Sequence, residues 1–177
     1  MEKWTTISRE NLHIAPRFGN VVKEHVKMSN GFEIKEYIMN EYPDWVNAVV
    51  ITKDNRVVLV NQYRHAGRRA FFEVPAGMKE AGETNEEAVA REVKEETGYT
   101  STKAPVYLGS YYTNPAVATN QVHSYLMTDA TEGERQLDEG EVLDVHVLSW
   151  EEVEQLGLTQ MFSVLALMLA KQKWEAL

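Results

Sequence analysis

The sequence of 177 residues contains no cysteine and no apolar run long enough to cross a membrane. Without cysteine there are no disulfides, no thiolate catalysis and no cysteine-ligated zinc. The longest apolar run, residues 164–170, is far shorter than the roughly 20 residues of a spanning helix. The N-terminus also lacks the apolar segment of a signal peptide. We therefore expect a cytoplasmic protein that does not enter a membrane.

Positive charge is scarce as well. The chain has 18 Lys and Arg against 27 Asp and Glu, which gives a formal net charge of −9. Sequence-independent binding to nucleic acid depends on basic side chains that neutralise phosphates, so we expect no nucleic-acid partner. A small anionic substrate is compatible with this charge, because bound cations can reverse the local field. Hydrophobic residues make up 44% of the chain, which predicts a folded core.

The most informative pattern lies in residues 77–99. This segment reads GMKEAGETNEEAVAREVKEETGY and fits G-x5-E-x7-R-E-U-x-E-E-x-G-U, where U is a bulky apolar residue and only Tyr99 fits loosely. Thr84 and Glu87 have the spacing of a capping box, and Gly98 suits the left-handed end of a helix. The pattern therefore predicts a helix of about four turns between these caps.

Three glutamates of this helix share one face, because Glu92, Glu95 and Glu96 are related as i, i+3 and i+4. Crowded carboxylates repel one another unless they are hydrated, paired with Arg91 or bound to a hard divalent cation. A glutamate-rich helix alone is typical of a solvated face. Such a face does not explain the preceding glycine turn, the Arg-Glu pair and the fixed spacings, so we favour a functional site.

This pattern is the signature of the Nudix hydrolases, and the chain resembles a metal-dependent pyrophosphate hydrolase of that family. Residues 62–64 (QYR) and 72–77 (FEVPAG) are similar to the ADP-ribose pyrophosphatase branch, and Pro115 stands where that branch has a proline. The proline loop departs from the branch, since it reads Asn-Pro-Ala at 114–116 and has Asn120 near an acidic position. Substrate choice among ADP-ribose and nucleoside diphosphate sugars is therefore left open.

The resemblance implies a site for Mg²⁺, with Mn²⁺ as the alternative ion. Glu92 and Glu96 are the expected ligands, together with the backbone carbonyl of Ala76. Glu95 and Glu141 are expected as further ligands. Mg²⁺ prefers oxygen ligands, and it would neutralise phosphate charge and activate a water.

Catalytic roles also extend beyond the metal ligands. The general base is expected in the loop 133–142, with Glu141 as base or added ligand and Glu139 as its rival. An ordinary acidic surface loop is the alternative to both. Glu95 is included with the catalytic residues, and Arg91 is expected to pair with a carboxylate of its helix.

Substrate contacts are expected from three residues. Arg64 matches an arginine that contacts the diphosphate in this branch, and a guanidinium can bind two phosphate oxygens at once. Met78, which follows the glycine of the motif, is a second. Trp4 resembles an early tryptophan that stacks on the base in dimeric relatives. The alternatives are a surface ion pair for Arg64 and simple packing for Trp4.

The predicted fold is α+β, a Nudix α/β/α sandwich with a mixed sheet over residues 45–177 and an N-terminal antiparallel β region over residues 1–44. The Asn30-Gly31 pair predicts a hairpin. The expected strands are residues 20–28, 32–40, 45–52, 56–62, 106–112, 122–128 and 142–148. Two further helices are expected at residues 150–156 and 159–173. In relatives such an N-terminal sheet helps to form a dimer, so we expect a homodimer. A hairpin that covers its own domain is the alternative.

The predicted reaction is Mg²⁺-dependent hydrolysis of the diphosphate bond of ADP-ribose or a nucleoside diphosphate sugar. The products would be a nucleoside monophosphate and a sugar phosphate. One alternative is a Nudix hydrolase that acts on dinucleoside polyphosphates or oxidised nucleotides. Another is a non-catalytic domain that senses a nucleotide.

Overall fold

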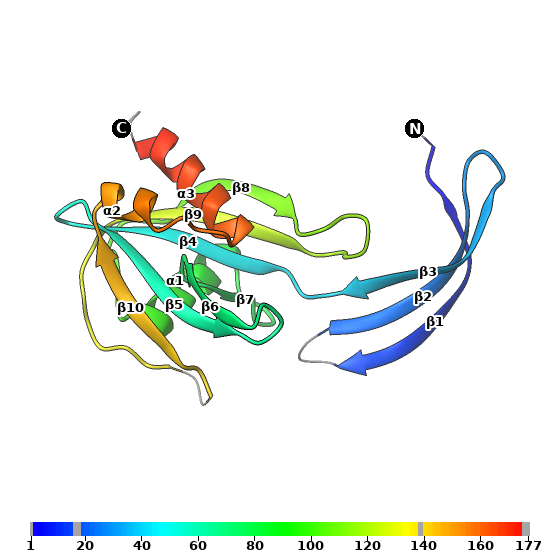
Figure 1. Cartoon of the computed structure of the whole chain (residues 1–177), viewed down its shortest axis with the longest axis horizontal. Coiled ribbons are helices and arrows are strands. Elements are labelled where there is room, and N and C mark those ends of the chain that lie inside the picture. The colour runs from blue at the N-terminus through cyan, green and yellow to red at the C-terminus, as the bar shows by residue number, and fades with distance from the viewer. Residues whose placement is uncertain (1, 16–18, 138–139, 175–177) are drawn as a thin grey trace. The chain divides into compact units, whose positions relative to one another are not determined.

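The computed structural model describes residues 2–15, 19–137 and 140–174. The strands are β1 (Thr5–Ala15), β2 (Gly19–Lys27), β3 (Glu33–Glu41), β4 (Trp45–Thr52), β5 (Val57–Arg64), β6 (Arg69–Glu73), β7 (Ala76–Met78), β8 (Val106–Tyr112), β9 (Gln121–Ala130) and β10 (Leu143–Leu148). The helices are α1 (Asn85–Thr97), α2 (Trp150–Gln155) and α3 (Met161–Trp174) (Figure 1). The chain divides into two compact units, Met1–Asp44 with Tyr111–Gln121, and Trp45–Ser110 with Val122–Leu177.

The first unit contains an antiparallel sheet in the order β1-β2-β3. The predicted hairpin at Asn30-Gly31 is confirmed, since the Gly31 N–H donates to the Met28 carbonyl at 3.0 Å. Strand β1 was not predicted. Its pairing with β2 shifts register between Thr6 and Ser8 and again further along the strand, and such bulges break the two-residue alternation on which strand prediction depends.

The loop between β8 and β9 belongs to this first unit. The Asn40 N–H donates to the Val117 carbonyl at 2.7 Å, and the Tyr37 hydroxyl donates to the Ala116 carbonyl. Asn120 is buried, donates to the Pro43 carbonyl at 3.2 Å and accepts a hydrogen bond from a threonine hydroxyl. The asparagine that departs from the family pattern is therefore engaged in holding this loop together.

The second unit is built on a seven-stranded mixed sheet in the order β10-β5-β4-β9-β8, with β6 paired to β5 and β7 paired to β4. Strands β4 and β9 run parallel, with Trp45 opposite Val122, while β10, β6 and β7 pair antiparallel with their neighbours. Strand β4 is buried after its first residue and β5 is buried along its first half, as expected for central strands covered on both faces.

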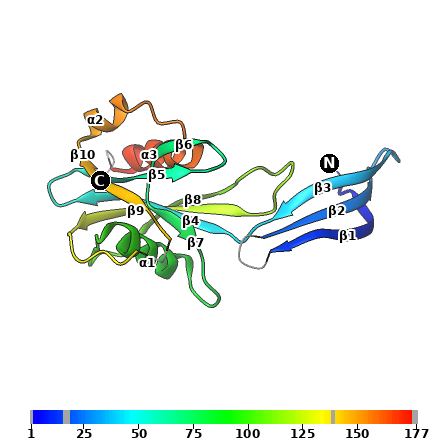
Figure 2. The ribbon, with the colours of Figure 1, turned by 60° about the horizontal axis from the view of Figure 1, so that its bottom comes forward.

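Helices cover both faces of this sheet, with α1 on one side and α2 and α3 on the other (Figures 1 and 2). On the first face Val89 and Val93 of α1 join a core cluster with Val46 of β4. On the opposite face Leu167 of α3 packs in a cluster with Val49 of β4. The predicted α/β/α sandwich is confirmed. Among the described residues no helix is long and apolar enough to cross a membrane.

Candidate active site

Helix α1 has the boundaries that its capping residues predict. The Thr84 N–H donates to the Glu87 carboxylate at 2.8 Å, and the Glu87 N–H donates to the Thr84 hydroxyl at 3.2 Å. Gly98 ends the helix with φ of 78°, a conformation that glycine adopts without strain. Because Val89 and Val93 are fully buried, the rotation of α1 about its axis is fixed. The positions of its glutamates follow from that rotation.

The turn that carries Ala76 and Gly77 lies against the glutamates of α1. Strand β7 pairs with β4 so that Ala76 stands opposite Asn47. The Ala76 N–H donates to Oε2 of Glu96 at 3.0 Å. A Cβ at Gly77 would lie 2.1 Å from the carboxyl carbon of Glu92, so a larger residue here would displace that carboxylate. The two carboxylates are thus held against the backbone of the turn.

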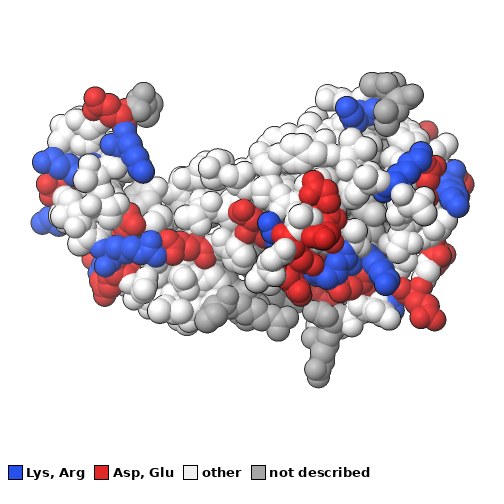
Figure 3. Space-filling view, turned by 180° about the vertical axis from the view of Figure 1, so that it is seen from behind, with Lys and Arg blue, Asp and Glu red and all other residues white. Residues whose placement is uncertain are grey.

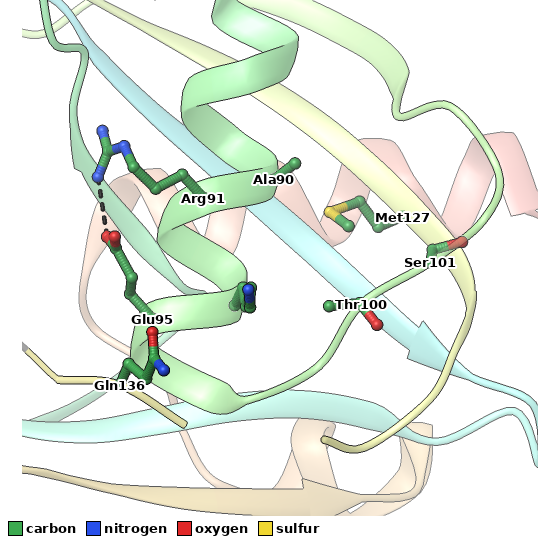
Figure 4. Close-up of a pocket in the computed structure, with 8 residues that line it drawn as sticks. Ala90, Arg91, Glu95, Thr100, Ser101, Met127 and Gln136 are labelled. Carbon is green, nitrogen blue, oxygen red and sulfur yellow. Dashed lines mark hydrogen bonds and ion pairs between the residues drawn. The ribbon is translucent and has the colours of Figure 1, made fainter. Parts of the chain in front are cut away.

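Arg91 joins the turn and the helix. Its Nε donates to Glu83 at 2.8 Å, and its Nη1 donates to Glu92 at 2.9 Å. The Nη1 also donates to Glu95 at 2.9 Å (Figure 4). Its Nη2 donates to the Met78 carbonyl at 3.0 Å. The expected pairing of Arg91 with a carboxylate is confirmed, and it extends to three. Met78, expected at the substrate, contributes its backbone carbonyl to this network.

The buried glutamates have raised pKa values. Burial raises the pKa of Glu96 to about 8, the hydrogen bond from Ala76 opposes this, and the charges of Glu92 and Glu141 raise it further. Burial also raises the pKa of Glu92 to about 7 against the favourable charge of Arg91. Glu83 differs, because its hydrogen bonds with Arg91 lower its pKa to about 2. Glu92 and Glu96 are therefore the carboxylates of this site whose charged form is least favoured by their surroundings.

Arg64 and Glu141 lie in the same electrostatic environment. The half-buried Glu141 raises the pKa of both Glu92 and Glu96 by its charge. The pKa of Arg64, at the end of β5, is raised first by hydrogen bonding to Glu73 and then by the charges of Glu73, Glu96 and Glu141. Glu139, the rival base, lies outside the described residues.

The structure also gives the positions of Trp4 and Glu73. Trp4 belongs to the first unit, where its ring meets Tyr37 edge-on with centroids 6.1 Å apart, so its proposed role at a base is untested. Glu73, which the sequence analysis passed over, is buried and paired with Arg64. A glutamate inside the apolar segment FFEVP is the signal that could have identified it, because charged residues are seldom buried without a partner.

In the part of the chain that the structure describes, no three His, Asp or Glu side chains converge as a ready-made metal site. The hydrogen bonds explain this arrangement. Arg91 holds Glu95 and one oxygen of Glu92, while the Ala76 N–H holds Glu96. The predicted ligand set stays a prediction.

A cavity of about 390 Å³ lies beside α1 (Figure 4). It is lined by Ala90, Arg91, Lys94, Glu95, Thr100, Ser101, Met127 and Gln136. Neither Glu92 nor Glu96 lines it, so this cavity does not coincide with these two carboxylates.

The face opposite to the view of Figure 1 carries acidic and basic side chains side by side rather than one sign of charge (Figure 3).

Comparison with known proteins gives consistent matches. The family model for the NUDIX domain matches residues 42–171. The ADP-ribose pyrophosphatase of Bacillus subtilis is 32% identical over 153 residues, which cover 85% of this chain and 81% of that protein. The methanol dehydrogenase activator of Bacillus methanolicus is 34% identical over 142 residues, which cover 77% of this chain and 76% of that protein.

A solved structure supports the fold as well. The crystal structure of an ADP compounds hydrolase aligns with a TM-score of 0.85 over 99% of this chain and 96% of that chain. The sequences are 21% identical, so this likeness concerns the fold.

Proposed function

Because the chain belongs to the Nudix family of pyrophosphohydrolases, we propose that it hydrolyses the diphosphate bond of ADP-ribose or a nucleoside diphosphate sugar. The products would be a nucleoside monophosphate and a sugar phosphate. The observation that carries this proposal is the pair of carboxylates under the Ala76-Gly77 turn, the buried Glu96 and the half-buried Glu92. The similarity to named ADP-ribose pyrophosphatases supports the choice of substrate.

The residues of the site fit a hard divalent cation. The candidate donors are all oxygens, the ligand type that Mg²⁺ prefers, with Mn²⁺ as the alternative. Glu92, Glu96 and the Ala76 carbonyl would hold the ion, with Glu95 as a further ligand and Glu141 as a further ligand where it does not act as the base. Gly77 leaves room beside Glu92 that a Cβ would fill. When bound, the cation would neutralise phosphate charge and activate a water.

The remaining groups have roles that follow from their positions. Arg91 fixes Glu92 and Glu95 through its hydrogen bonds and limits their mutual repulsion. Arg64 donates hydrogen bonds to the diphosphate. Glu141 accepts a proton of the attacking water as the water oxygen bonds to one phosphorus and the bridging oxygen leaves with the other phosphate, with Glu139 as the rival base.

The partner we propose is a second copy of the chain. The N-terminal sheet supports a homodimer, because β1 is exposed along almost its whole length and leaves Ile7, Leu12 and Ile14 between 45% and 60% exposed. A cytoplasmic location fits the absence of cysteine. No nucleic acid or membrane is included among the proposed partners.

The test is turnover of a substrate panel with and without Mg²⁺. ADP-ribose, GDP-mannose, UDP-glucose, diadenosine polyphosphates and nucleoside triphosphates would each be incubated with the full chain, and phosphate release would be measured with a coupled phosphatase. We expect Mg²⁺-dependent turnover of ADP-ribose or a sugar nucleotide. Turnover of polyphosphates alone would favour the alternative substrate class, and no turnover would favour a nucleotide sensor.

A further inference from the structure

Glu73 is a buried carboxylate that has no part in the roles assigned above. It is the last residue of β6 and stands opposite Val60 of β5, and the residue is only 3% exposed. A buried carboxylate is costly unless it is paired and hydrogen-bonded. Its partner is Arg64, at the other end of the same strand pair. The question is whether the pair serves only the stability of this hairpin.

The geometry of the pair gives the guanidinium a defined direction. Nε of Arg64 donates to the two oxygens of Glu73 at 3.1 and 3.2 Å, and Nη2 donates to Oε2 at 2.5 Å. No hydrogen bond of Arg64 Nη1 is found among the described residues. The side chain of Glu73 is 5% exposed, whereas that of Arg64 is 47% exposed. Glu73 thus holds one edge of the guanidinium and leaves the Nη1 side accessible.

The guanidinium of Arg64 lies within range of the charges of the candidate active site. The charges of Glu96 and Glu141 both act on the guanidinium. These carboxylates come from α1 and from the segment before β10. An arginine near these carboxylates can donate to a diphosphate that a cation bound at the carboxylates would hold.

We propose that Glu73 is a positioning residue, which aims the Nη1 side of Arg64 at the diphosphate of the substrate. The inference rests on the proposed function, because it takes a diphosphate as the ligand of Arg64. Free arginine side chains lose rotamer freedom when they bind, and an anchor on Nε and Nη2 imposes that loss before the substrate arrives. Because the pair is neutral overall, Arg64 acts through directed hydrogen bonds rather than through net charge.

The test is a double-mutant cycle with Glu73→Gln, Arg64→Ala and the double variant. KM and kcat for ADP-ribose would be measured with Mg²⁺, together with Tm. The Gln variant keeps the side-chain size but places an amide against Nε of Arg64. We expect KM to rise about tenfold in Glu73→Gln, with a smaller change in kcat. In the Arg64→Ala background the same substitution should leave KM unchanged, because the group that it positions is gone.

Glu152→Gln provides a control outside the site, since Glu152, on α2, also pairs with an arginine, Arg56, at 3.5 Å. It should lower Tm and leave KM unchanged. Should Glu73→Gln not fold, Glu73→Asp would replace it in the cycle and should show the same dependence on Arg64.

Two results would overturn the inference while the enzyme remains active. One is a lower Tm with unchanged KM in the Glu73 variant. The other is an equal rise in KM with and without Arg64. Absence of turnover by the unmodified chain would instead refute the proposed function, and the inference with it.

Discussion

Among single residues, Glu96 shows how burial and charge combine at this site. It is 4% exposed, accepts a hydrogen bond from Ala76 and lies near two other acidic groups that raise its pKa. Such a group is costly unless it binds a cation or a proton. A role of this carboxylate in the reaction would explain why the chain retains it despite its cost in folding free energy.

We therefore expect Glu96→Gln to lower kcat by about a hundredfold or more, because even residues that only support a ligand contribute up to about that factor. Tm should be kept or raised, because glutamine can still accept from Ala76 and removes a buried charge. Phosphate release with Mg²⁺ and a thermal melt would measure the two effects. Glu151→Gln, the same change at an exposed glutamate, should alter neither. Full activity in Glu96→Gln would refute its assignment as a metal ligand.

The positions of the site residues differ in whether local sequence or the pairing of distant strands determines them. The shared face of Glu92 and Glu96 follows from helical periodicity, so the sequence alone predicted it. The contact of Gly77 with Glu92 depends on the pairing of β7 with β4, and the bond between Glu73 and Arg64 depends on the pairing of β5 with β6. These pairings join residues through tertiary structure, and no local pattern in the sequence specifies them.

At the scale of elements, the connection of α1 to the preceding loop depends on Glu83. Its carboxylate accepts from Arg91 and, at 2.9 Å, from the backbone N–H of Glu80. These hydrogen bonds lower the pKa of Glu83 from 4.5 to about 2. A carboxyl with a lowered pKa in the folded state contributes stability above pH 4.5 and loses it as pH falls toward 2.

We expect Glu83→Gln to lower Tm at neutral pH by a few degrees, with the difference from the unmodified chain shrinking as pH falls from 4.5 to 2. Melting curves at a series of pH values would measure it. Glu87→Gln should show a smaller effect of the same sign, because its hydrogen bonds with Thr84 also lower the pKa of Glu87 but by less than those of Glu83. A Tm difference that is constant down to pH 2 would show that the charge of Glu83 is not responsible.

Elements with local signals were predicted with good boundaries. The capping residues Thr84 and Ser149 begin α1 and α2, as their spacing to a following glutamate predicts. Strand β7 is three residues long, too short for an alternating pattern, and β6 was not distinguished from the motif that it precedes. Strand β1 was missed for another reason, because its bulges interrupt the alternating pattern. The elements that were missed owe their existence to their pairing partners.

At the scale of the whole molecule, the two compact units separate residues that lie together in the predicted Nudix domain, residues 45–177. The loop with Pro115 and Asn120 belongs to the first unit, although β8 and β9 on either side continue into the second. Asn120 is buried within that unit by bonds to the loop and to Pro43. Its substitution should therefore disturb the loop first, and an effect on substrate choice would follow from that disturbance.

The same unit leads to the prediction of oligomeric state. A three-stranded sheet has a small core, here Val22 and Val26, and β1 contributes exposed apolar side chains. A second copy that covers β1 would remove Leu12 and Ile14 from water. We expect light scattering after size exclusion to give twice the chain mass of 20.2 kDa, and Leu12→Glu with Ile14→Glu to give the monomer mass.

Met168→Glu is the matched control for the dimer prediction, because Met168 is equally an exposed apolar residue, at 60%, but lies on α3 of the other unit. It should leave the dimer mass unchanged. If the β1 variant became monomeric and also lost turnover, the active site would need the second copy. If it became monomeric with full turnover, the N-terminal sheet would serve assembly alone, and Trp4 would have no part in catalysis. A monomer for the unmodified chain would instead favour a sheet that covers only its own domain.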